Sequence, residues 1–214
     1  MKQDWLVSIP ENRRLILFML GWGATPNAVQ HLPIPAGYDI LCCYDHRSLS
    51  ILNPADFAQY EQIYLFAWSF GVWVAEQSCQ QLPLRKAIAI NGTPYPASQQ
   101  YGLRLKVLQR TIRSVAAMGG NPFKDESTPE RYAPDGAFPV PSPQEQVEEL
   151  DFLAEACQTL PEQPHLPWTR AYIATRDEIF PPARMQAYWG ELGQDFNSYH
   201  YPFHHAAIVL DELD

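Results

Sequence analysis

Ser69 stands in a local pattern that suits a nucleophile. It is the central residue of positions 67–71 (AWSFG), a small-x-Ser-x-Gly motif. The apolar run 63–68 has strand length and no turn former, which predicts a buried strand. Beyond it, apolar residues recur at helical spacing, at Val72, Ala75, Cys79 and Leu82. Serine beside glycine is also ordinary turn chemistry, but a turn between strand and helix favours an exposed acyl-transfer hydroxyl.

An acyl-transfer serine needs a base and an acid that orients the base. In doubly wound enzymes of this type, the acid follows a strand beyond the serine, and the histidine follows the next strand. Asp177 comes after a predicted strand at 168–174, and His200 lies in a predicted strand at 196–201. The chain order therefore predicts Ser69, Asp177 and His200 as a catalytic triad.

Two of these assignments have alternatives in the sequence. Asp177 could instead cap the helix that begins near Pro181, whereas Asp45 ends a strand but precedes the serine and fits the order poorly. His204 is the second candidate for the base, although it opens a predicted helix at 204–213 together with His205.

The developing negative charge on a substrate carbonyl requires two backbone N–H donors. One is expected from Phe70, directly after the nucleophile, and the other from a loop after an early strand. The glycine-rich loop Gly21-Trp22-Gly23 follows the apolar run 15–20, so Trp22 is the predicted second donor.

Apolar runs alternate with helical patterns along the chain, which predicts a mostly parallel, doubly wound α/β sheet. The expected strands are an edge strand at 2–8 and runs at 15–20, 39–44, 63–68, 87–90, 168–174 and 196–201. The length of 214 residues suits one domain spanning 1–214.

An insertion at about 93–167 interrupts the alternation, and we expect it to form a helical cap over the carboxyl edge of the sheet. One helix is predicted at 103–117. A second begins at a capping box, Ser142 to Glu145, with Val147, Leu150, Ala154 and Cys157 as its apolar stripe.

Composition narrows the possible partners. The net charge of −9 argues against nucleic acid, and no apolar run of membrane-spanning length or signal peptide is evident, which predicts a cytoplasmic protein without a membrane partner. The four cysteines lack metal-site spacing, so neither a metal nor another cofactor is expected.

Positive charge is concentrated in one part of this acidic chain. The segment from Gln77 to Lys124 contains no Asp or Glu but holds seven of the fifteen Lys and Arg residues. Lys106, Arg110 and Arg113 share one stripe of the predicted helix. They form either a solvated face or a docking surface for an acidic partner.

Six segments resemble the BioG-type pimeloyl-acyl-carrier-protein methyl ester esterases of biotin synthesis, within the α/β-hydrolase superfamily. They are LGWGATPNAVQHL, CCYDHRSL, FAWSFGVWVAEQ, AIAINGTPYP, RDEIFPPARMQAYW and YHYPF. The resemblance implies Ser69 as nucleophile, Asp177 as acid and His200 as base, with acyl carrier protein as the partner that presents the substrate. A thioesterase of the same fold and a non-catalytic acyl-carrier binding module are the alternatives.

Overall fold

A mostly parallel sheet forms the frame of the protein, as predicted. In the computed structural model, residues 1–118 and 137–213 are described, and they form seven strands in the order β1-β3-β2-β4-β5-β6-β7. Strand β1 pairs antiparallel with β3 at one edge, and the other neighbours pair in parallel. The strands are β1 (Lys2–Val7), β2 (Arg14–Met19), β3 (Tyr38–Tyr44), β4 (Gln62–Trp68), β5 (Leu84–Ile90), β6 (Arg170–Ala174) and β7 (Gly193–Phe196).

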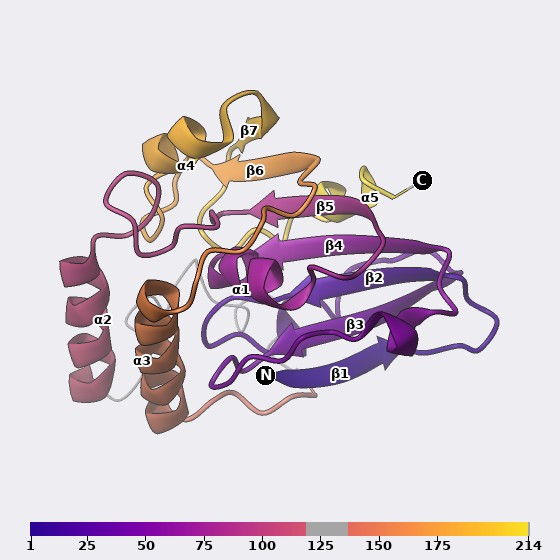
Figure 1. The fold of residues 1–214 in the computed structure, drawn as a ribbon, viewed down its shortest axis with the longest axis horizontal. Helices are drawn as coiled ribbons and strands as arrows, with labels where there is room; N and C mark the ends of the chain where they lie inside the picture. The colour runs from indigo at the N-terminus through magenta and orange to yellow at the C-terminus, as the bar shows by residue number, and fades with distance from the viewer. Residues whose placement is uncertain (119–136, 214) are drawn as a thin grey trace.

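Helices cover the sheet and extend past its carboxyl edge (Figure 1). They are α1 (Phe70–Ser78), α2 (Leu105–Met118), α3 (Pro143–Thr159), α4 (Pro182–Trp189) and α5 (Ala207–Leu210). Within the described ranges, each helix is too short or too polar to cross a lipid bilayer.

Each face of the sheet has its own hydrophobic core, because successive side chains of a strand point to opposite faces. In β2, Leu15 and Leu17 belong to the core that contains α1 and α4. Ile16 and Phe18 belong to the other core, which contains α5. A strand buried on both faces is continuously apolar. For this reason β2 and β4 could be predicted from uninterrupted apolar runs in the sequence.

Helices α2 and α3 pack together beyond the carboxyl ends of the parallel strands (Figure 1). The predicted capping box at the start of α3 is present: Ser142 Oγ accepts from the Glu145 backbone N–H, and Glu145 Oε2 accepts from the Ser142 backbone N–H. Most of the predicted connection between the two helices, including Lys124, lies outside the described residues.

The apolar stripe predicted for α3 was rotated from the face that the structure buries. Leu150 and Ala154 are buried as predicted, but Val147 and Cys157 are only partly buried. The buried face also includes Gln146, Glu149 and Leu153. The prediction placed the stripe from apolar residue types alone, and two polar side chains on the buried face concealed its true position.

The last predicted strand was misplaced, because β7 spans Gly193–Phe196 and not 196–201. The last predicted helix is shorter than expected, because α5 spans Ala207–Leu210 and not 204–213. Strand β7 ends at Phe196, and the Ser198 backbone N–H donates to the Phe196 carbonyl in a turn. His200 therefore lies in a loop after the last strand and not within it. Helix α5 begins at Ala207 instead of at 204.

Helix α1 also differs from its predicted form, because it ends at Ser78 and is buried on nearly all sides. Glu76 lies off the predicted apolar stripe, yet it is only 2% exposed. The segment that leads into β6 covers it, and its carboxylate accepts from the Leu166 backbone N–H at 3.0 Å and from Trp168 Nε1 at 2.7 Å.

Candidate active site

The predicted sharp turn at Ser69 joins the end of β4 to the start of α1. Ser69 has φ 59° and ψ −126°, a conformation that costs a residue with a Cβ of order 1–3 kcal/mol and that clusters at functional sites. The turn lies tightly against β2, since a Cβ on Gly71 would lie 2.2 Å from the Met19 carbonyl oxygen. The glycine of the motif is therefore required by close approach of the backbone.

The structure brings Ser69, His200 and Asp177 together from three separate loops. His200 Nε2 lies 3.1 Å from Ser69 Oγ, and His200 Nδ1 lies 2.8 Å from Asp177 Oδ2. All three residues are buried. Such a chain of hydroxyl, imidazole and carboxylate can remove the proton of the hydroxyl as its oxygen attacks a carbonyl carbon.

Asp177 also caps the turn that follows it, so the capping contacts and the contact with His200 coexist. Its Oδ1 accepts from the backbone N–H groups of Ile179 at 2.8 Å and Phe180 at 2.9 Å. These bonds fix the carboxylate while Oδ2 faces His200. Asp45, in contrast, forms ion pairs with Lys2 and Arg47.

Three residues that the sequence did not single out hold His200 in place. Trp68 Nε1 donates to the His200 carbonyl at 3.0 Å, and Asn91 Nδ2 donates to the same oxygen at 2.8 Å. The Phe180 ring stacks on the imidazole at an interplanar angle of 10°.

The other candidate base is directed elsewhere. His204 Nε2 lies 3.3 Å from Ser198 Oγ, and its ring packs against that of His205 with centroids 4.1 Å apart. His205 is exposed. Of the three histidines in this segment, His200 is the one that contacts Ser69.

Phe70 and the loop that carries Trp22 lie beside Ser69. Phe70 is the first residue of α1, and the first N–H groups of a helix have no acceptor within the helix. On the other side, a Cβ on Gly21 would lie 3.0 Å from Ser69 Cβ, so the loop that carries Trp22 touches the serine. The Trp22 indole N–H donates to the Gln146 carbonyl at 2.7 Å.

Glu149 of α3 is a buried carboxylate that contacts the Trp22 loop and that the sequence analysis did not identify. Its Oε2 accepts from the Gly23 backbone N–H at 2.9 Å, and its Oε1 accepts from the His46 backbone N–H at 2.8 Å. Desolvation raises the pKa of Glu149 to about 7, against the lowering effect of the two N–H donors. In the sequence, the one indication of its burial is that Glu149 falls on the same helix face as Leu150 and Leu153.

The raised pKa of Glu149 predicts a pH-dependent free energy of unfolding. In the unfolded chain the carboxyl ionises near 4.5, whereas in the folded protein it ionises near 7. Between these values the folded state holds more protons, so its stability falls as pH rises. At 1.36 kcal/mol per pKa unit, the loss is about 3 kcal/mol.

Urea unfolding of the wild type and Glu149→Gln at several pH values measures this effect. The wild type should lose about 3 kcal/mol relative to the variant between pH about 4.5 and 7. A difference in unfolding free energy that stays constant over this range would contradict it.

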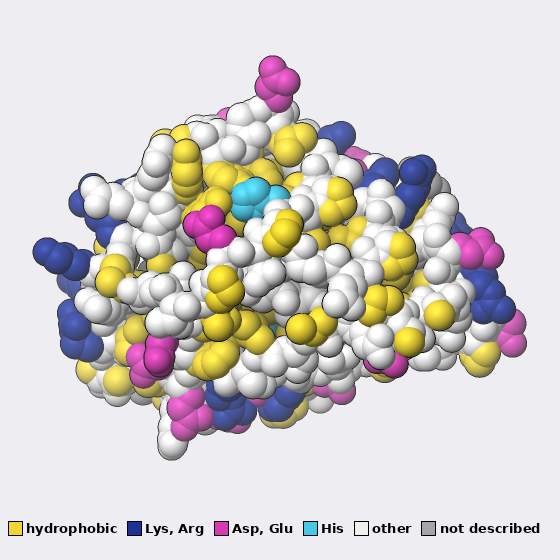
Figure 2. Space-filling model, in the orientation of Figure 1, with side chains coloured by type: hydrophobic (Ala, Val, Ile, Leu, Met, Phe, Trp, Pro, Cys, Tyr) yellow, Lys and Arg dark blue, Asp and Glu magenta, His cyan; other side chains and the backbone are white. Residues whose placement is uncertain are grey.

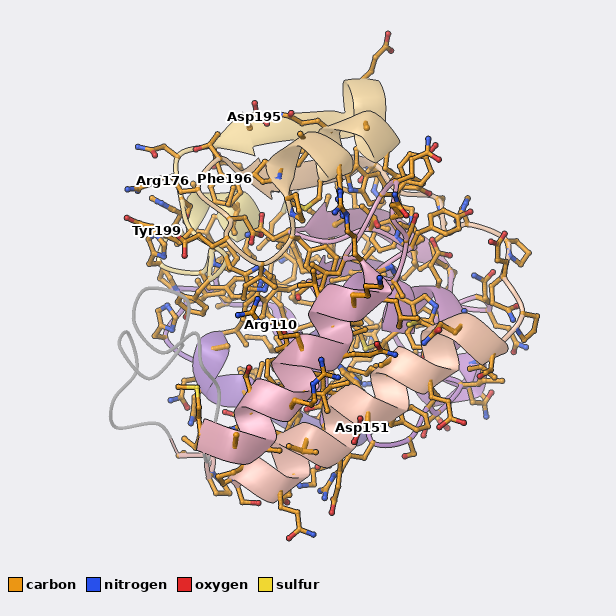
Figure 3. All side chains as sticks on the ribbon, turned by 90° about the vertical axis from the view of Figure 1, so that its left-hand side faces the viewer. Arg110, Asp151, Arg176, Asp195, Phe196 and Tyr199 are labelled. Carbon is orange, nitrogen blue, oxygen red and sulfur yellow. The ribbon has the colours of Figure 1, made fainter. Side chains whose placement is uncertain are left out.

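The three residues of the predicted basic stripe are exposed on α2 and do not contact the triad: Lys106, Arg110 and Arg113. Figure 2 shows Lys and Arg side chains at the end of the molecule where α2 lies. In Figure 3, Arg110 on α2 faces the same side as Arg176 and Tyr199. The latter two lie next in sequence to Asp177 and His200, so the basic helix is on the side of the molecule from which the triad loops emerge.

The four cysteines are free and mostly buried. Cys42, Cys43 and Cys79 are buried free cysteines, and desolvation raises the pKa of each. Among residues 1–118 and 137–213, no group of three or more His, Cys, Asp or Glu side chains is placed to hold a metal ion.

Comparison with known sequences gives relatives over nearly the full chain. An uncharacterized protein of Haemophilus influenzae is 34% identical over 200 residues, which cover 90% of this chain and 91% of the relative. A malonyl-[acyl-carrier protein] O-methyltransferase of Bacteroides fragilis is 30% identical over 210 residues, 95% of this chain. The match spans only 42% of the latter protein.

Solved structures agree with the sequence relatives. The crystal structure of BioG from Haemophilus influenzae superposes with a TM-score of 0.80 at 32% identity, covering 95% of each chain. An α/β hydrolase from a deep-sea metagenome library superposes with a TM-score of 0.59 at 12% identity, covering all of this chain and 95% of the other. The second match shows the α/β-hydrolase fold alone.

The family model described as pimeloyl-ACP methyl esterase BioG matches residues 4–208. With the fold and the structural match, this shows that the chain is an α/β hydrolase and belongs to the BioG family.

Proposed function

We propose that this protein is a serine carboxylesterase that hydrolyses the methyl ester of a pimeloyl chain carried on acyl carrier protein. The products are methanol and the free carboxylate, and the thioester to the carrier stays intact. The observation that carries the proposal is the chain of contacts from Ser69 Oγ through His200 to Asp177, at 3.1 and 2.8 Å, in a member of the BioG family.

In the proposed reaction, Ser69 Oγ attacks the ester carbonyl carbon while His200 Nε2 accepts its proton. Asp177 holds the imidazole with Nδ1 protonated and stabilises the imidazolium that forms. The backbone N–H groups of Phe70 and Trp22 stabilise the negative charge on the carbonyl oxygen. Collapse of the tetrahedral intermediate breaks the bond to methoxide, which leaves as methanol with the proton from His200.

The acyl-enzyme is then hydrolysed by the same groups in reverse roles. His200 accepts a proton from a water molecule as the water oxygen attacks the acyl carbon, and it returns that proton to Ser69 Oγ as the ester bond breaks. The released product carries the new carboxylate at the far end from the thioester.

The acyl carrier protein is the proposed partner at the basic face of α2. Acyl carrier proteins are acidic, and complementary charge raises the rate of association more than it raises affinity. Lys106, Arg110 and Arg113 are exposed on α2. In Figure 3, Arg110 is on the side of the molecule that carries Arg176 and Tyr199.

Reversing the charge at Arg110 and Arg113 should raise KM for the substrate bound to acyl carrier protein. We expect Arg110→Glu with Arg113→Glu to raise KM for the carrier-bound ester about tenfold, because the encounter loses its electrostatic attraction. The steady-state rates are measured at low and high salt, and the difference should shrink at high salt. A small soluble ester is the control: an equal loss on that substrate would contradict the docking role.

Product analysis tests the proposed reaction. Wild-type protein is incubated with the methyl ester of pimeloyl-acyl carrier protein, and the mass of the carrier is measured by mass spectrometry. Loss of one methyl group with the acyl chain still attached supports the esterase. Release of free carrier with an intact methyl ester would assign a thioesterase instead.

A further inference from the structure

The carboxylate of Glu149 joins α3 to two loops at the carboxyl edge of the sheet. One oxygen accepts from Gly23 in the loop after β2, and the other accepts from His46 in the loop after β3. The residue is 2% exposed. Both acceptor oxygens are therefore committed to backbone N–H groups that lie more than a hundred residues away in sequence.

A second contact from the same face of α3 reaches the loop after β2. The backbone carbonyl of Gln146 accepts from the Trp22 indole at 2.7 Å. Gln146 and Glu149 are three residues apart and thus neighbours on the helix surface. Trp22 and Gly23 are adjacent residues of one loop, and both form hydrogen bonds to α3. The preceding residue, Gly21, lies against Ser69.

Burying the Glu149 carboxylate costs free energy, which is unexpected for a residue that serves only to pack α3 against the loops. Its pKa is raised chiefly by desolvation, so two neutral N–H donors only partly offset the burial of the charge. The charged groups nearby are Asp45, which raises the pKa further, and Arg47, which lowers it. An apolar residue at a buried site of this kind is often neutral or stabilising.

We propose that Glu149, together with the Gln146 carbonyl, is a positioning device that holds the Trp22–Gly23 segment so that its backbone N–H faces the oxyanion. The inference rests on the proposed function, because an oxyanion forms only if Ser69 attacks a carbonyl. Glutamine cannot replace Glu149 without loss, since an amide has one acceptor oxygen and would turn its NH₂ toward one of the two N–H donors.

The test compares Glu149→Gln with Glu76→Gln. Glu76 is the matched control, because it is equally buried and accepts from backbone and indole N–H groups, but its partners are Gln80 and residues 165–168. Each variant is assayed on a small soluble ester, and its affinity is measured for a trifluoromethyl ketone, which adds the serine oxygen to give a tetrahedral oxyanion.

We expect Glu149→Gln to lower kcat by about 10²-fold, the order found for loss of one oxyanion donor, with KM within about threefold. Its inhibition constant for the ketone should rise by a similar factor. Glu76→Gln should leave both quantities within about twofold. A Glu149→Gln enzyme that is folded and matches the wild type in kcat and ketone affinity overturns the positioning role but not the proposed function.

If Glu149→Gln does not fold, Trp22→Phe decides the question, because it removes the indole N–H and keeps an aromatic ring. A parallel loss of kcat and ketone affinity supports the proposal, and unchanged values overturn it. A wild type that hydrolyses no ester and does not react with a fluorophosphonate overturns both the proposed function and the positioning role.

Discussion

Replacement of Ser69 by alanine is expected to lower turnover by on the order of 10⁴- to 10⁶-fold, because the attacking oxygen is lost while the rest of the site remains. Steady-state hydrolysis of the carrier-bound methyl ester measures the effect. Ser69 Oγ is hydrogen-bonded to His200. The substitution therefore removes this hydrogen bond and leaves the packing of the turn unchanged.

Alanine is the suitable replacement because it keeps the Cβ and hence the cost of the positive φ of 59° at this position. The variant should unfold at nearly the temperature of the wild type. A fluorophosphonate should label the wild type and not Ser69→Ala. Failure to label the folded wild type would favour the non-catalytic binding module that the sequence left open.

Much of this site could be predicted because its signals are local. The bounded apolar run of β4, the small-x-Ser-x-Gly motif and the capping box of α3 each occupy a few consecutive residues. The order of serine, aspartate and histidine extends over the chain, but it depends only on which strand each residue follows. For that reason, the sequence predicted that Asp177 and His200 meet Ser69, and the structure brings these side chains together although the last strand was misplaced.

The parts that could not be predicted depend on partners distant in sequence. Glu149 and Glu76 both look like ordinary helix-surface glutamates, and neither is near its donors in the chain: Gly23 is 126 residues from Glu149, and Trp168 is 92 residues from Glu76. Only the tertiary fold determines that these carboxylates are buried. Of the two, only Glu149 is proposed to bear on the mechanism, and local patterns did not reveal it.

Replacement of His200 by alanine is expected to lower turnover by a similar factor to that of Ser69→Ala, on the order of 10⁴-fold or more, because members of a triad act as a unit. His204→Ala should stay within about threefold of the wild type. The reason is geometric: His204 Nε2 lies near Ser198 Oγ, at 3.3 Å, whereas His200 Nε2 lies 3.1 Å from Ser69 Oγ.

Loss of the His200 ring also removes packing against Trp68 and Phe180, so a lower melting temperature alone does not identify a base. Added imidazole separates the two effects. It should fill the space left in His200→Ala and restore part of the activity with a pH dependence set by its own pKa, because the missing group is a proton acceptor. Normal turnover in His200→Ala with loss in His204→Ala would assign the base to His204. Since Asp177 Oδ2 contacts the His200 ring, that result would also leave the carboxylate without a catalytic role.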